Sequence, residues 1–587
     1  MQNSLERLVL SLICIGTVIH AVSFMAHGQQ NSNAADEPRS GTISGKVVND
    51  SGQPMIGAVV FVRSAGDGAF NRSAIANLEG KFEVSGLDNG IYYVSANSPA
   101  FVTRPIDVDS PAPTYRVGDT VNLELIRGGV ITGTVTNSAG EPVVGVRVRA
   151  FMVKDATGKR ARSVAFSSGE RTTDDRGIYR IYGLSPGTYL VQSGGGGLQM
   201  SMNATDFDAP TFAPSSTRDS ATEIQVRSGE ETSVDIRYRS EPGHSISGTV
   251  KLQGTNGANV SLSVVGDLVT AVNRTYQQAN AHGFTLSGIA DGEYELTAQE
   301  AVGVPTGPFP EIALTDPLRV MVKGSDVTGL ELIPKLQASI SGKISLESSK
   351  IPECQNKRKP LFSETMIAIM QNRKEAKVDD VALARLYLGS SIPDKDGAFV
   401  LRNLRPGQYS FNPRYFARYW YLKSISISSG GTSLPAKSPA TSTTSKDAAR
   451  NWTALKTGDR LNGLTITLTE GAASIRGLIN KPPEAKAETP SRIYLVPAER
   501  ERADDPLRYF TSEVVSDGSF SFGNLPPGKY WTLAQPTLEE NPNSTEKLRL
   551  PDAAEARARL RRSAELLKSE VELKPCQNLT DVKLPPN

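Results

Sequence analysis

A short stretch in which apolar and polar residues alternate recurs five times along the chain. It reads ISGKV from Ile43, ITGTV from Ile131, ISGTV from Ile246, ISGKI from Ile340 and IRGLI from Ile475. Alternation with a period of two is typical of a β-strand that buries one face. The first isoleucine, the glycine and the last aliphatic residue then share the buried face, where the glycine allows another backbone to approach closely. We expect each copy to open one repeated unit.

A second recurring stretch follows each opening strand. In Asp175 to Val191 it consists of a turn, an alternating strand, a Gly-Leu-x-Pro-Gly corner and another alternating strand. The interval before this stretch varies, whereas its internal spacing hardly changes. Turn residues between two alternating strands predict a β-hairpin, so we expect each unit to contain a closing hairpin. We expect Tyr179 and Tyr189 within it to face the core.

A final strand ends each unit, as in TVNLELI from Thr120, and the next opening strand follows within a few residues. About seven strands in roughly 90 to 130 residues suit two packed sheets rather than one parallel sheet. The predicted fold class is therefore all-β, a tandem array of about five seven-stranded β-sandwich domains. The predicted divisions are 41–127, 128–241, 242–336, 337–471 and 472–587.

Three inserts interrupt the β pattern. Ser193–Thr217 is rich in glycine, and we expect a mobile loop. The low-complexity stretch 428–450 should be a flexible insert of the fourth unit. A helix is predicted over about 551–569, because Pro551 and Asp552 begin a segment with leucines at helical spacing among arginine and glutamate. We expect this amphipathic helix to pack on the fifth unit, with docking to a membrane or a partner as the alternative.

The N-terminus has the pattern of a targeting segment. Leu8–Phe24 is an apolar run preceded by Arg7, and the small residues before Gln29 allow cleavage there. We predict a signal peptide at 1–28 and a disordered leader at 29–40, with a membrane anchor as the alternative. No transmembrane segment is expected after cleavage. The protein should therefore be exported to the periplasm or outer cell envelope, or be secreted.

Charge gives no case for nucleic acid as a partner, because 64 basic and 62 acidic residues leave a net charge of only +2. After signal cleavage two cysteines remain, Cys354 and Cys576. In an oxidising compartment they could form a disulfide between the fourth and fifth units, and two separate thiols are the alternative.

No catalytic constellation is evident. Only His244 and His282 remain after signal cleavage, and neither has the partners that a metal centre or a general base requires. His282 is expected to be a polar residue of the hairpin turn. Acidic turns such as Asp394 to Gly397 could suggest calcium, but they lack the roughly six to eight oxygen ligands that this ion takes. We predict no enzymatic activity, no metal and no cofactor.

Aromatic residues cluster in RYFARYWYLK, after the fourth predicted hairpin. Tyr415, Tyr419, Trp420 and Tyr421 could contact a sugar or a protein partner. The alternative is that alternate members belong to the core, with Tyr419 and Trp420 on opposite faces of one strand.

The stretch ISGKVVNDSGQPMIGAVVFV, followed by GKFEVSGLDNGIYYV, resembles the carboxypeptidase regulatory-like domain. That domain is a transthyretin-like β-sandwich, close in pattern to Cna B-type modules and to carbohydrate-binding sandwiches. The first two units share the full pattern, and the third to fifth share the opening strand and the predicted hairpin. The resemblance implies an exported bacterial protein built from repeats, and it specifies a fold rather than a chemistry.

The expected function is that of an exported, non-enzymatic binding or scaffold protein that contacts carbohydrate or protein at the bacterial cell envelope. One alternative is an accessory subunit of an outer-membrane transporter or of a secreted enzyme. A more remote alternative is an unrecognised hydrolase.

Overall fold

The computed structural model describes residues 41–584 with fifteen gaps, and the predicted signal peptide and leader lie outside the described residues. The gaps are 67–70, 105–112, 160–168, 196–203, 253–256, 265–268, 275, 279–280, 302–309, 356, 373–389, 429–444, 480–490, 516 and 537–544.

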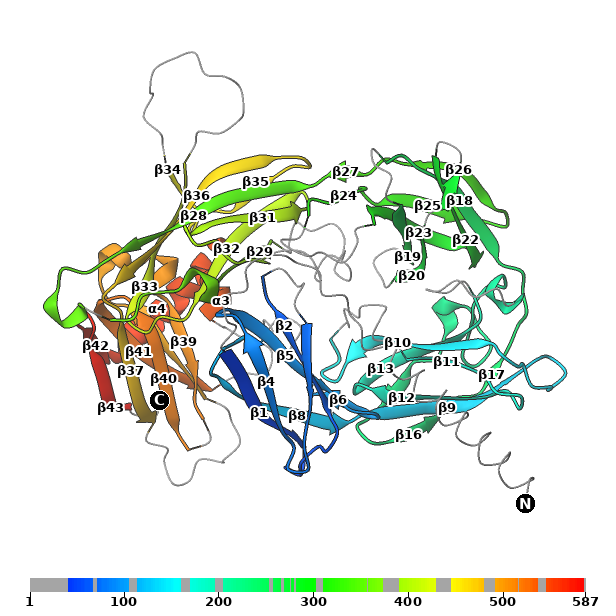
Figure 1. The fold of residues 1–587 in the computed structure, drawn as a ribbon, viewed down its shortest axis with the longest axis horizontal. Helices are drawn as coiled ribbons and strands as arrows, with labels where there is room; N and C mark the ends of the chain where they lie inside the picture. The colour runs from blue at the N-terminus through cyan, green and yellow to red at the C-terminus, as the bar shows by residue number, and fades with distance from the viewer. Residues whose placement is uncertain are drawn as a thin grey trace, which may run out of the picture. The chain divides into compact units, whose positions relative to one another are not determined.

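The described strands form ten sheets, which pair into five β-sandwiches in chain order (Figure 1). The fold is therefore all-β and tandem, as the alternating pattern predicted. In the first sandwich the sheets have the orders β4-β1-β8-β6 and β3-β2-β5-β7. Its strands are β1 (Gly41–Asn49), β2 (Val59–Ser64), β3 (Asn71–Ile75), β4 (Lys81–Leu87), β5 (Ile91–Asn97), β6 (Phe101–Thr103), β7 (Tyr115–Arg116) and β8 (Thr120–Arg127).

The second sandwich has the sheet β12-β9-β16, in which β17 also pairs with β9, and the sheet β11-β10-β13-β14, in which β15 also pairs with β13. Its strands are β9 (Gly129–Thr136), β10 (Arg147–Asp155), β11 (Glu170–Thr172), β12 (Ile178–Leu184), β13 (Gly187–Ser193), β14 (Thr211–Phe212), β15 (Ile224–Val226), β16 (Glu231–Ser233) and β17 (Ile236–Arg237).

The third sandwich has the sheet β21-β22-β18-β26 and the sheet β20-β19-β23-β24-β27, in which β25 also pairs with β23. Its strands are β18 (His244–Val250), β19 (Ala258–Val264), β20 (Val269–Arg274), β21 (Tyr276–Gln278), β22 (Ala281–Ile289), β23 (Gly292–Glu300), β24 (Ala313–Leu314), β25 (Leu318–Val322), β26 (Val327–Leu332) and β27 (Lys335–Leu336).

The fourth sandwich has the sheets β31-β28-β36-β33-β34 and β30-β29-β32-β35. Its strands are β28 (Ala338–Glu347), β29 (Thr365–Gln371), β30 (Ser390–Ser391), β31 (Ala398–Leu404), β32 (Gly407–Tyr415), β33 (Trp420–Ser428), β34 (Ser445–Asp447), β35 (Thr453–Leu455) and β36 (Arg460–Glu470).

The fifth sandwich has the sheets β40-β37-β43 and β39-β38-β41-β42. Its strands are β37 (Ala473–Ile479), β38 (Ser491–Pro497), β39 (Phe510–Glu513), β40 (Ser519–Leu525), β41 (Gly528–Pro536), β42 (Glu570–Leu573) and β43 (Asn578–Leu584), and its α-helices are α3 (Thr545–Leu548) and α4 (Ala554–Leu567).

The opening strand holds the same place in every sandwich. It pairs antiparallel with the strand before the corner and parallel with the final strand, as β1 does with β4 and β8. The same two pairings recur for β9, β18, β28 and β37. In each sandwich the first strand therefore contacts a strand near the end of the same sandwich, which is β26 in the third.

The glycine of the opening strand is required by that parallel contact. A Cβ built on Gly45 would lie 1.9 Å from the carbonyl oxygen of Val121 in β8. The glycines at the same position in the other sandwiches would place a Cβ at 2.0 to 2.4 Å from a final-strand carbonyl oxygen: Gly133, Gly248, Gly342 and Gly477. The predicted close approach of another backbone is confirmed in all five.

The predicted closing hairpin is wrong. The strands on either side of the corner lie in different sheets: β12 pairs with β9, whereas β13 pairs with β10. The same holds for β4 and β5, which pair with β1 and β2. The corner is therefore an arch that carries the chain from one sheet to the other across the core.

A tyrosine fixes each arch. The hydroxyl of Tyr92 donates to the carbonyl oxygen of Asp88 at 2.8 Å, four residues earlier. The same hydrogen bond, at 2.7 to 2.9 Å, is made by Tyr189, Tyr294, Tyr409 and Tyr530. Such a tyrosine corner closes the bend with a buried ring and a satisfied hydroxyl. Burial raises the pKa of Tyr294 and Tyr409 to about 12. Tyr179 and Tyr189 face the core, as predicted.

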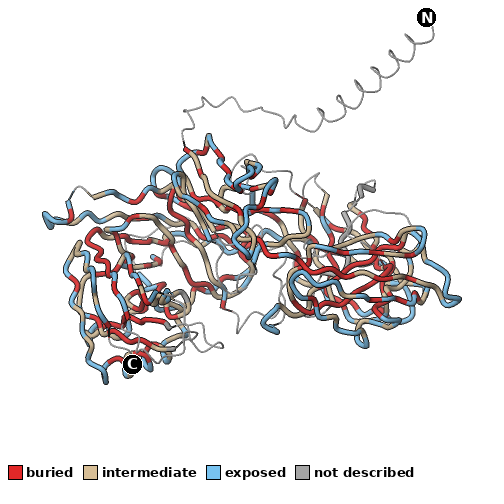
Figure 2. Tube along the Cα trace, turned by 90° about the horizontal axis from the view of Figure 1, so that it is seen from below, coloured by how far each residue is buried: buried red, intermediate tan, exposed pale blue. Residues whose placement is uncertain are grey.

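Buried residues follow the strands of each sandwich, with exposed residues at the turns between them (Figure 2). In the fifth sandwich α4 adds a second, smaller core on the outer face of β38 and β41. Leu560 and Ala564 are buried there, whereas Leu566 is 84% exposed. The helix therefore packs on the fifth sandwich, although only part of its predicted apolar face does so.

The predicted mobile loop Ser193–Thr217 is wrong for its described part. β14 pairs with β13 as the edge strand of the same sheet, and Asp206 of the 3₁₀-helix η2 (Ala204–Asp206) forms a buried ion pair with Arg147 of β10 at 2.5 Å. Glycine content did not reveal this, because the buried arginine lies far away in the sequence. The predicted flexible insert 428–450 lies largely outside the described residues, and its described end forms β34, next to the buried Ala448.

Candidate functional site

The aromatic segment Tyr415–Tyr421 joins β32 to β33 in the fourth sandwich. Trp420 is fully buried in the core of that sandwich, so it has no surface to offer a ligand. Tyr415 packs against the same core, and its hydroxyl donates to the carbonyl oxygen of Trp420 at 3.4 Å. Burial raises the pKa of Tyr415. Of the four predicted ligand-contacting aromatics, Trp420 thus lies in the core, and Tyr415 is partly buried against it.

The other two lie at contacts within the chain. The hydroxyl of Tyr419 accepts a hydrogen bond of 3.4 Å from Asn578 in the fifth sandwich, and the ammonium of Lys357 lies 5.1 Å from the centre of its ring. Tyr421 is half-buried, and burial raises its pKa. Ligand contact by Tyr415, Tyr419 and Tyr421 stays a prediction.

Phe416, from the same segment, faces the first sandwich. The guanidinium of Arg116 lies 4.4 Å from the centre of the Phe416 ring and 3.7 Å from a carboxylate oxygen of Glu364. Glu364 is 5% exposed and also accepts two hydrogen bonds of 2.8 Å from Arg358. A buried carboxylate needs such cationic partners. The segment therefore connects parts of the chain that lie far apart in sequence.

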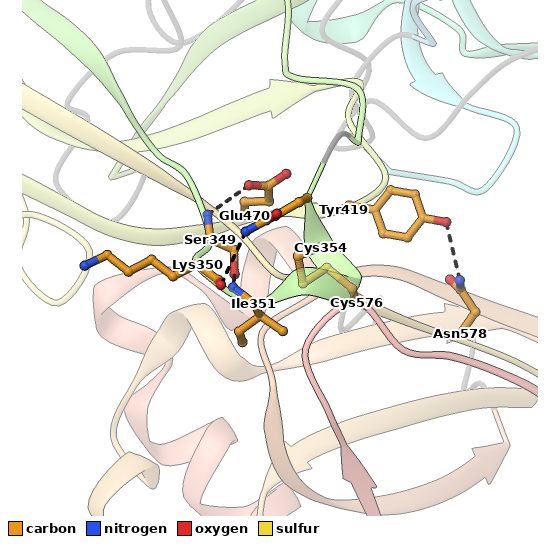
Figure 3. Close-up of a disulfide and its surroundings, with 9 residues drawn as sticks. Ser349, Lys350, Ile351, Cys354, Tyr419, Glu470, Cys576 and Asn578 are labelled. Carbon is orange, nitrogen blue, oxygen red and sulfur yellow. Dashed lines mark hydrogen bonds between the residues drawn. A yellow bond between two sulfur atoms is a disulfide. The ribbon is translucent and has the colours of Figure 1, made fainter.

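Cys354 and Cys576 meet beside Tyr419 (Figure 3). Cys354 ends the 3₁₀-helix η4 (Pro352–Cys354) of the fourth sandwich, and Cys576 precedes β43 of the fifth. Their Cα atoms lie 5.5 Å apart and their sulfur atoms are bonded, across 222 residues of sequence. Cys354 is completely buried. This geometry holds the start of the last strand to the fourth sandwich.

The aspartates of the acidic turns accept hydrogen bonds from backbone amides of the same turns. One carboxylate oxygen of Asp174 accepts from the amides of Arg176, at 3.0 Å, and Ile178, at 2.8 Å. The hydrogen bond from the Ile178 amide is the largest cause that lowers the pKa of Asp174. Asn77 accepts the equivalent two hydrogen bonds in the first sandwich, and Asp394 does so in the fourth. Because the neutral side chain of Asn77 accepts the same two hydrogen bonds as the aspartates, the role of these side-chain oxygens is to stabilise the turn.

The two histidines lie apart. His244 is the first residue of β18, and its Nε2 atom lies 3.3 Å from a carboxylate oxygen of Asp291. His282 lies within β22, opposite Gln277, so its predicted place in a hairpin turn is wrong. Across the described ranges, no group of three or more His, Cys, Asp or Glu side chains is arranged to hold a metal ion.

A groove of about 430 Å³ is lined by residues of the first and second sandwiches. Phe61 lies on its wall and is 44% exposed, because it occupies the outward phase of the alternating strand β2. An outward phenylalanine in the run AVVFV was the sequence signal for this surface, and our sequence analysis missed it. The groove combines apolar side chains with hydroxyl and amide groups: Phe61, Phe101, Met152, Ser95, Asn97 and Thr103.

A known protein family matches the first of the five sandwiches. Residues 42–124 match the carboxypeptidase regulatory-like domain. The regulatory-like domain thus coincides with the strands from β1 to β8, where the full sequence pattern is present. Membership of the other four sandwiches in that family stays a prediction. No curated protein matches this chain.

The solved structures that match this chain come from several bacteria. The Bacillus anthracis TIE protein is 14% identical over 50% of this chain and 50% of its own, with a TM-score of 0.13. The minor pilin of Streptococcus agalactiae is 14% identical over 35% of this chain and 97% of its own, with a TM-score of 0.19. Two B repeat units of the collagen-binding protein of Staphylococcus aureus are 11% identical over 73% of this chain and 100% of their own, with a TM-score of 0.13. This chain thus spans half the length of the first of these proteins.

None of the helices in the described part of the chain is long and apolar enough to cross a membrane.

Proposed function

We propose that this chain is an exported, non-enzymatic binding or scaffold protein that contacts carbohydrate or protein at the bacterial cell envelope. The groove between the first and second sandwiches is the observation that carries this proposal. Its polar groups, which form the larger part of the exposed lining, would make hydrogen bonds to the ligand, and apolar side chains such as Phe61 would contact an apolar face of it.

The recurring residues support a binding role over catalysis. The tyrosine hydroxyls close the arches, the acidic turns bind their own amides, and the opening-strand glycines make room for backbone. These residues build the repeated scaffold, and the groove adds to the arch residues Gly183 and Tyr189 side chains such as Phe61 and Met152 that do not recur in that pattern. Binding surfaces carried by variable segments on a constant scaffold are common in β-sandwich proteins.

The test is a glycan array run in parallel with a pull-down from the native envelope, using the chain that begins after the predicted signal peptide. We expect one of the two to yield a ligand whose affinity falls at least tenfold, about 1.4 kcal/mol, in the variant Phe61→Ala. Leu566→Ala is the matched control, since it also truncates an exposed apolar side chain but lies on α4, in a different sandwich from the groove.

The possible outcomes separate the alternatives. Binding that Phe61→Ala leaves unchanged would move the site away from the groove. Stable co-purification with an envelope transporter or a secreted enzyme would favour the accessory-subunit alternative. Turnover in a hydrolase screen that a single substitution abolishes would overturn the non-enzymatic assignment.

A further inference from the structure

One backbone position in each arch has a left-handed conformation, and its residue changes along the chain. We call it the corner residue. In chain order it is Gly86, Gly183, Gly288, Asn403 and Asn524, with φ angles of 71°, 72°, 68°, 59° and 55°. Glycine adopts this conformation without steric cost, and asparagine is among the few other residues that tolerate it. The backbone therefore accepts both residues, and the change to asparagine has another cause.

In the fourth sandwich, the side chain of Asn403 reaches into the third. Its Nδ2 donates to the carbonyl oxygen of Pro310 at 3.0 Å, and its Oδ1 accepts from the amide of Ile312 at 2.8 Å. Asn403 is only 5% exposed. A buried amide group satisfied on both sides by one backbone segment holds that segment in a defined position.

In the fifth sandwich, the equivalent side chain reaches into the fourth. Nδ2 of Asn524 donates to the carbonyl oxygens of Ala417 and Trp420, both at 2.7 Å. These two carbonyls belong to the turn of the aromatic segment between β32 and β33. The same position in two successive sandwiches thus bonds to the backbone of the sandwich before it.

At the glycine corners of the second and third sandwiches, the backbone of another glycine lies against the corner residue. A Cβ built on Gly128, just before β9, would lie 2.7 Å from the Cα atom of Gly183. A Cβ on Gly243, just before β18, would lie 2.6 Å from the Cα atom of Gly288. Both distances are too short for any side chain, so two glycine backbones pack directly on each other at these junctions.

The two positions change together along the sequence. Gly128 and Gly243 stand three residues before the opening-strand isoleucine, and the corresponding residues in the last two sandwiches are Gln337 and Ala472. Junctions with a glycine corner therefore have a second glycine before the opening strand, and junctions with an asparagine corner do not. Gln337 contributes further contacts, since its side chain donates to the carbonyl oxygens of Leu314 and Lys335 in the third sandwich.

We propose that Asn403 and Asn524 are positioning residues that fix the third, fourth and fifth sandwiches to one another, whereas the glycine corner residues contribute no side chain to the junctions of the first three. This role concerns the junctions and is independent of whether the groove binds a ligand.

The test replaces each asparagine in two ways. Asn403→Gly and Asn524→Gly keep the left-handed backbone and remove only the amide group. Asn524→Asp replaces a double donor by a carboxylate facing two carbonyl oxygens, so it should weaken its junction more than Asn524→Gly does. Asn403→Asp keeps the oxygen that accepts from Ile312, but its second oxygen would face the carbonyl oxygen of Pro310 in a buried site, so it should also weaken its junction more than Asn403→Gly does. A purely steric role for the side chain would predict little effect of aspartate at either position, because aspartate has nearly the size of asparagine.

The measurements are hydrogen exchange of the amides of Ile312 and Trp420, and distance distributions between spin labels on neighbouring sandwiches. We expect Asn403→Gly to speed exchange of the Ile312 amide about three- to tenfold, the effect of losing a net hydrogen bond. Asn524→Gly should speed exchange of the Trp420 amide indirectly, because the turn that this amide closes onto Ala417 loses its support. Both variants should broaden the distance distributions. The Asn524 variants are made together with Cys354→Ser and Cys576→Ser, so that the disulfide does not mask the change.

Gly183→Asn is the control, because a Cβ there meets nothing within 4 Å and asparagine tolerates the backbone. It should leave the exchange of both amides unchanged. Unchanged exchange and unchanged distance distributions in folded Asn403→Gly and Asn524→Gly would overturn the proposal, as would the same effect of aspartate and glycine at both positions.

Discussion

The hydroxyl of Tyr189 donates a hydrogen bond of 2.7 Å to the carbonyl oxygen of Ser185, across the arch between β12 and β13. Four other tyrosines make the same bond in their own sandwiches, and no other side-chain hydrogen bond is repeated in all five among the described residues. The bond links the two sheets at the point where the chain crosses from one to the other.

Replacing this tyrosine should therefore loosen the arch. In Tyr189→Phe the ring stays, the hydroxyl is lost and the carbonyl oxygen of Ser185 loses its partner, which should cost about 1 kcal/mol of local stability. Hydrogen exchange of the amides of β12 and β13 measures the change. Tyr182→Phe in the same sandwich is the control, because Tyr182 is 41% exposed, and it should have almost no effect. Equal effects of the two substitutions would contradict the role of the tyrosine corner.

The opening-strand glycine should not tolerate a methyl group. In Gly477→Ala the new Cβ would lie 2.1 Å from the carbonyl oxygen of Val582, so β37 and β43 would have to separate. We expect a loss of about 3 kcal/mol or more from the stability of the fifth sandwich, measured by chemical denaturation. Gly523→Ala in the same sandwich is the control, because its Cβ meets nothing within 4 Å, and it should change stability by less than about 1 kcal/mol.

Cys354 and Cys576 should be found as a disulfide in the exported protein. Peptide mapping without reductant should recover the two linked peptides, and labelling of free thiols should be absent in the chain that begins after the predicted signal peptide. In the chain-entropy estimate, closing a loop of this length stabilises the folded state by up to about 5 kcal/mol. Cys354→Ser with Cys576→Ser should therefore lower the unfolding temperature. Two free thiols in protein secreted into an oxidising compartment would contradict the pairing.

The turn carboxylate of Asp174 should make the second sandwich sensitive to acid. Hydrogen bonds from the backbone lower its pKa in the folded state below the ordinary value of 3.8. Its contribution to stability is thus complete above that value and is lost as the pH falls below about 4, through the lowered pKa. Asp174→Asn should keep the turn and remove this part of the acid sensitivity, since Asn77 makes the same two hydrogen bonds in the first sandwich. Unfolding followed at pH 7 and at pH 3 tests both parts.

The sequence was sufficient where the physical cause is local. The period of two predicted that Ile43 and Val47 lie on the buried face of the opening strand, and both are buried. The glycine between them predicted the close approach of another backbone, which the structure contains. Neither inference needed knowledge of the partner strand. The two-sheet architecture followed from the number and length of such strands.

The sequence was insufficient where a structural feature depends on contacts with a distant part of the chain. The residues around Gly183 bend the chain in a hairpin and in an arch alike, and only the pairing of β12 with β9 and of β13 with β10 distinguishes the two. Trp420 is another case, because an alternating strand does not reveal which of its faces is covered. Residues from distant parts of the chain cover Phe416 and Glu364, and no local pattern predicts such contacts.

The parallel pairing of the first and the last strand has a mechanical consequence. Within one sandwich, tension along the chain enters at the start of β1 and leaves at the end of β8, which run side by side over Ser44 to Asn49. Pulling these ends apart slides the strands along each other, so that the hydrogen bonds between them bear the load together instead of opening one by one. An array of such sandwiches should therefore resist unfolding by tension along the chain.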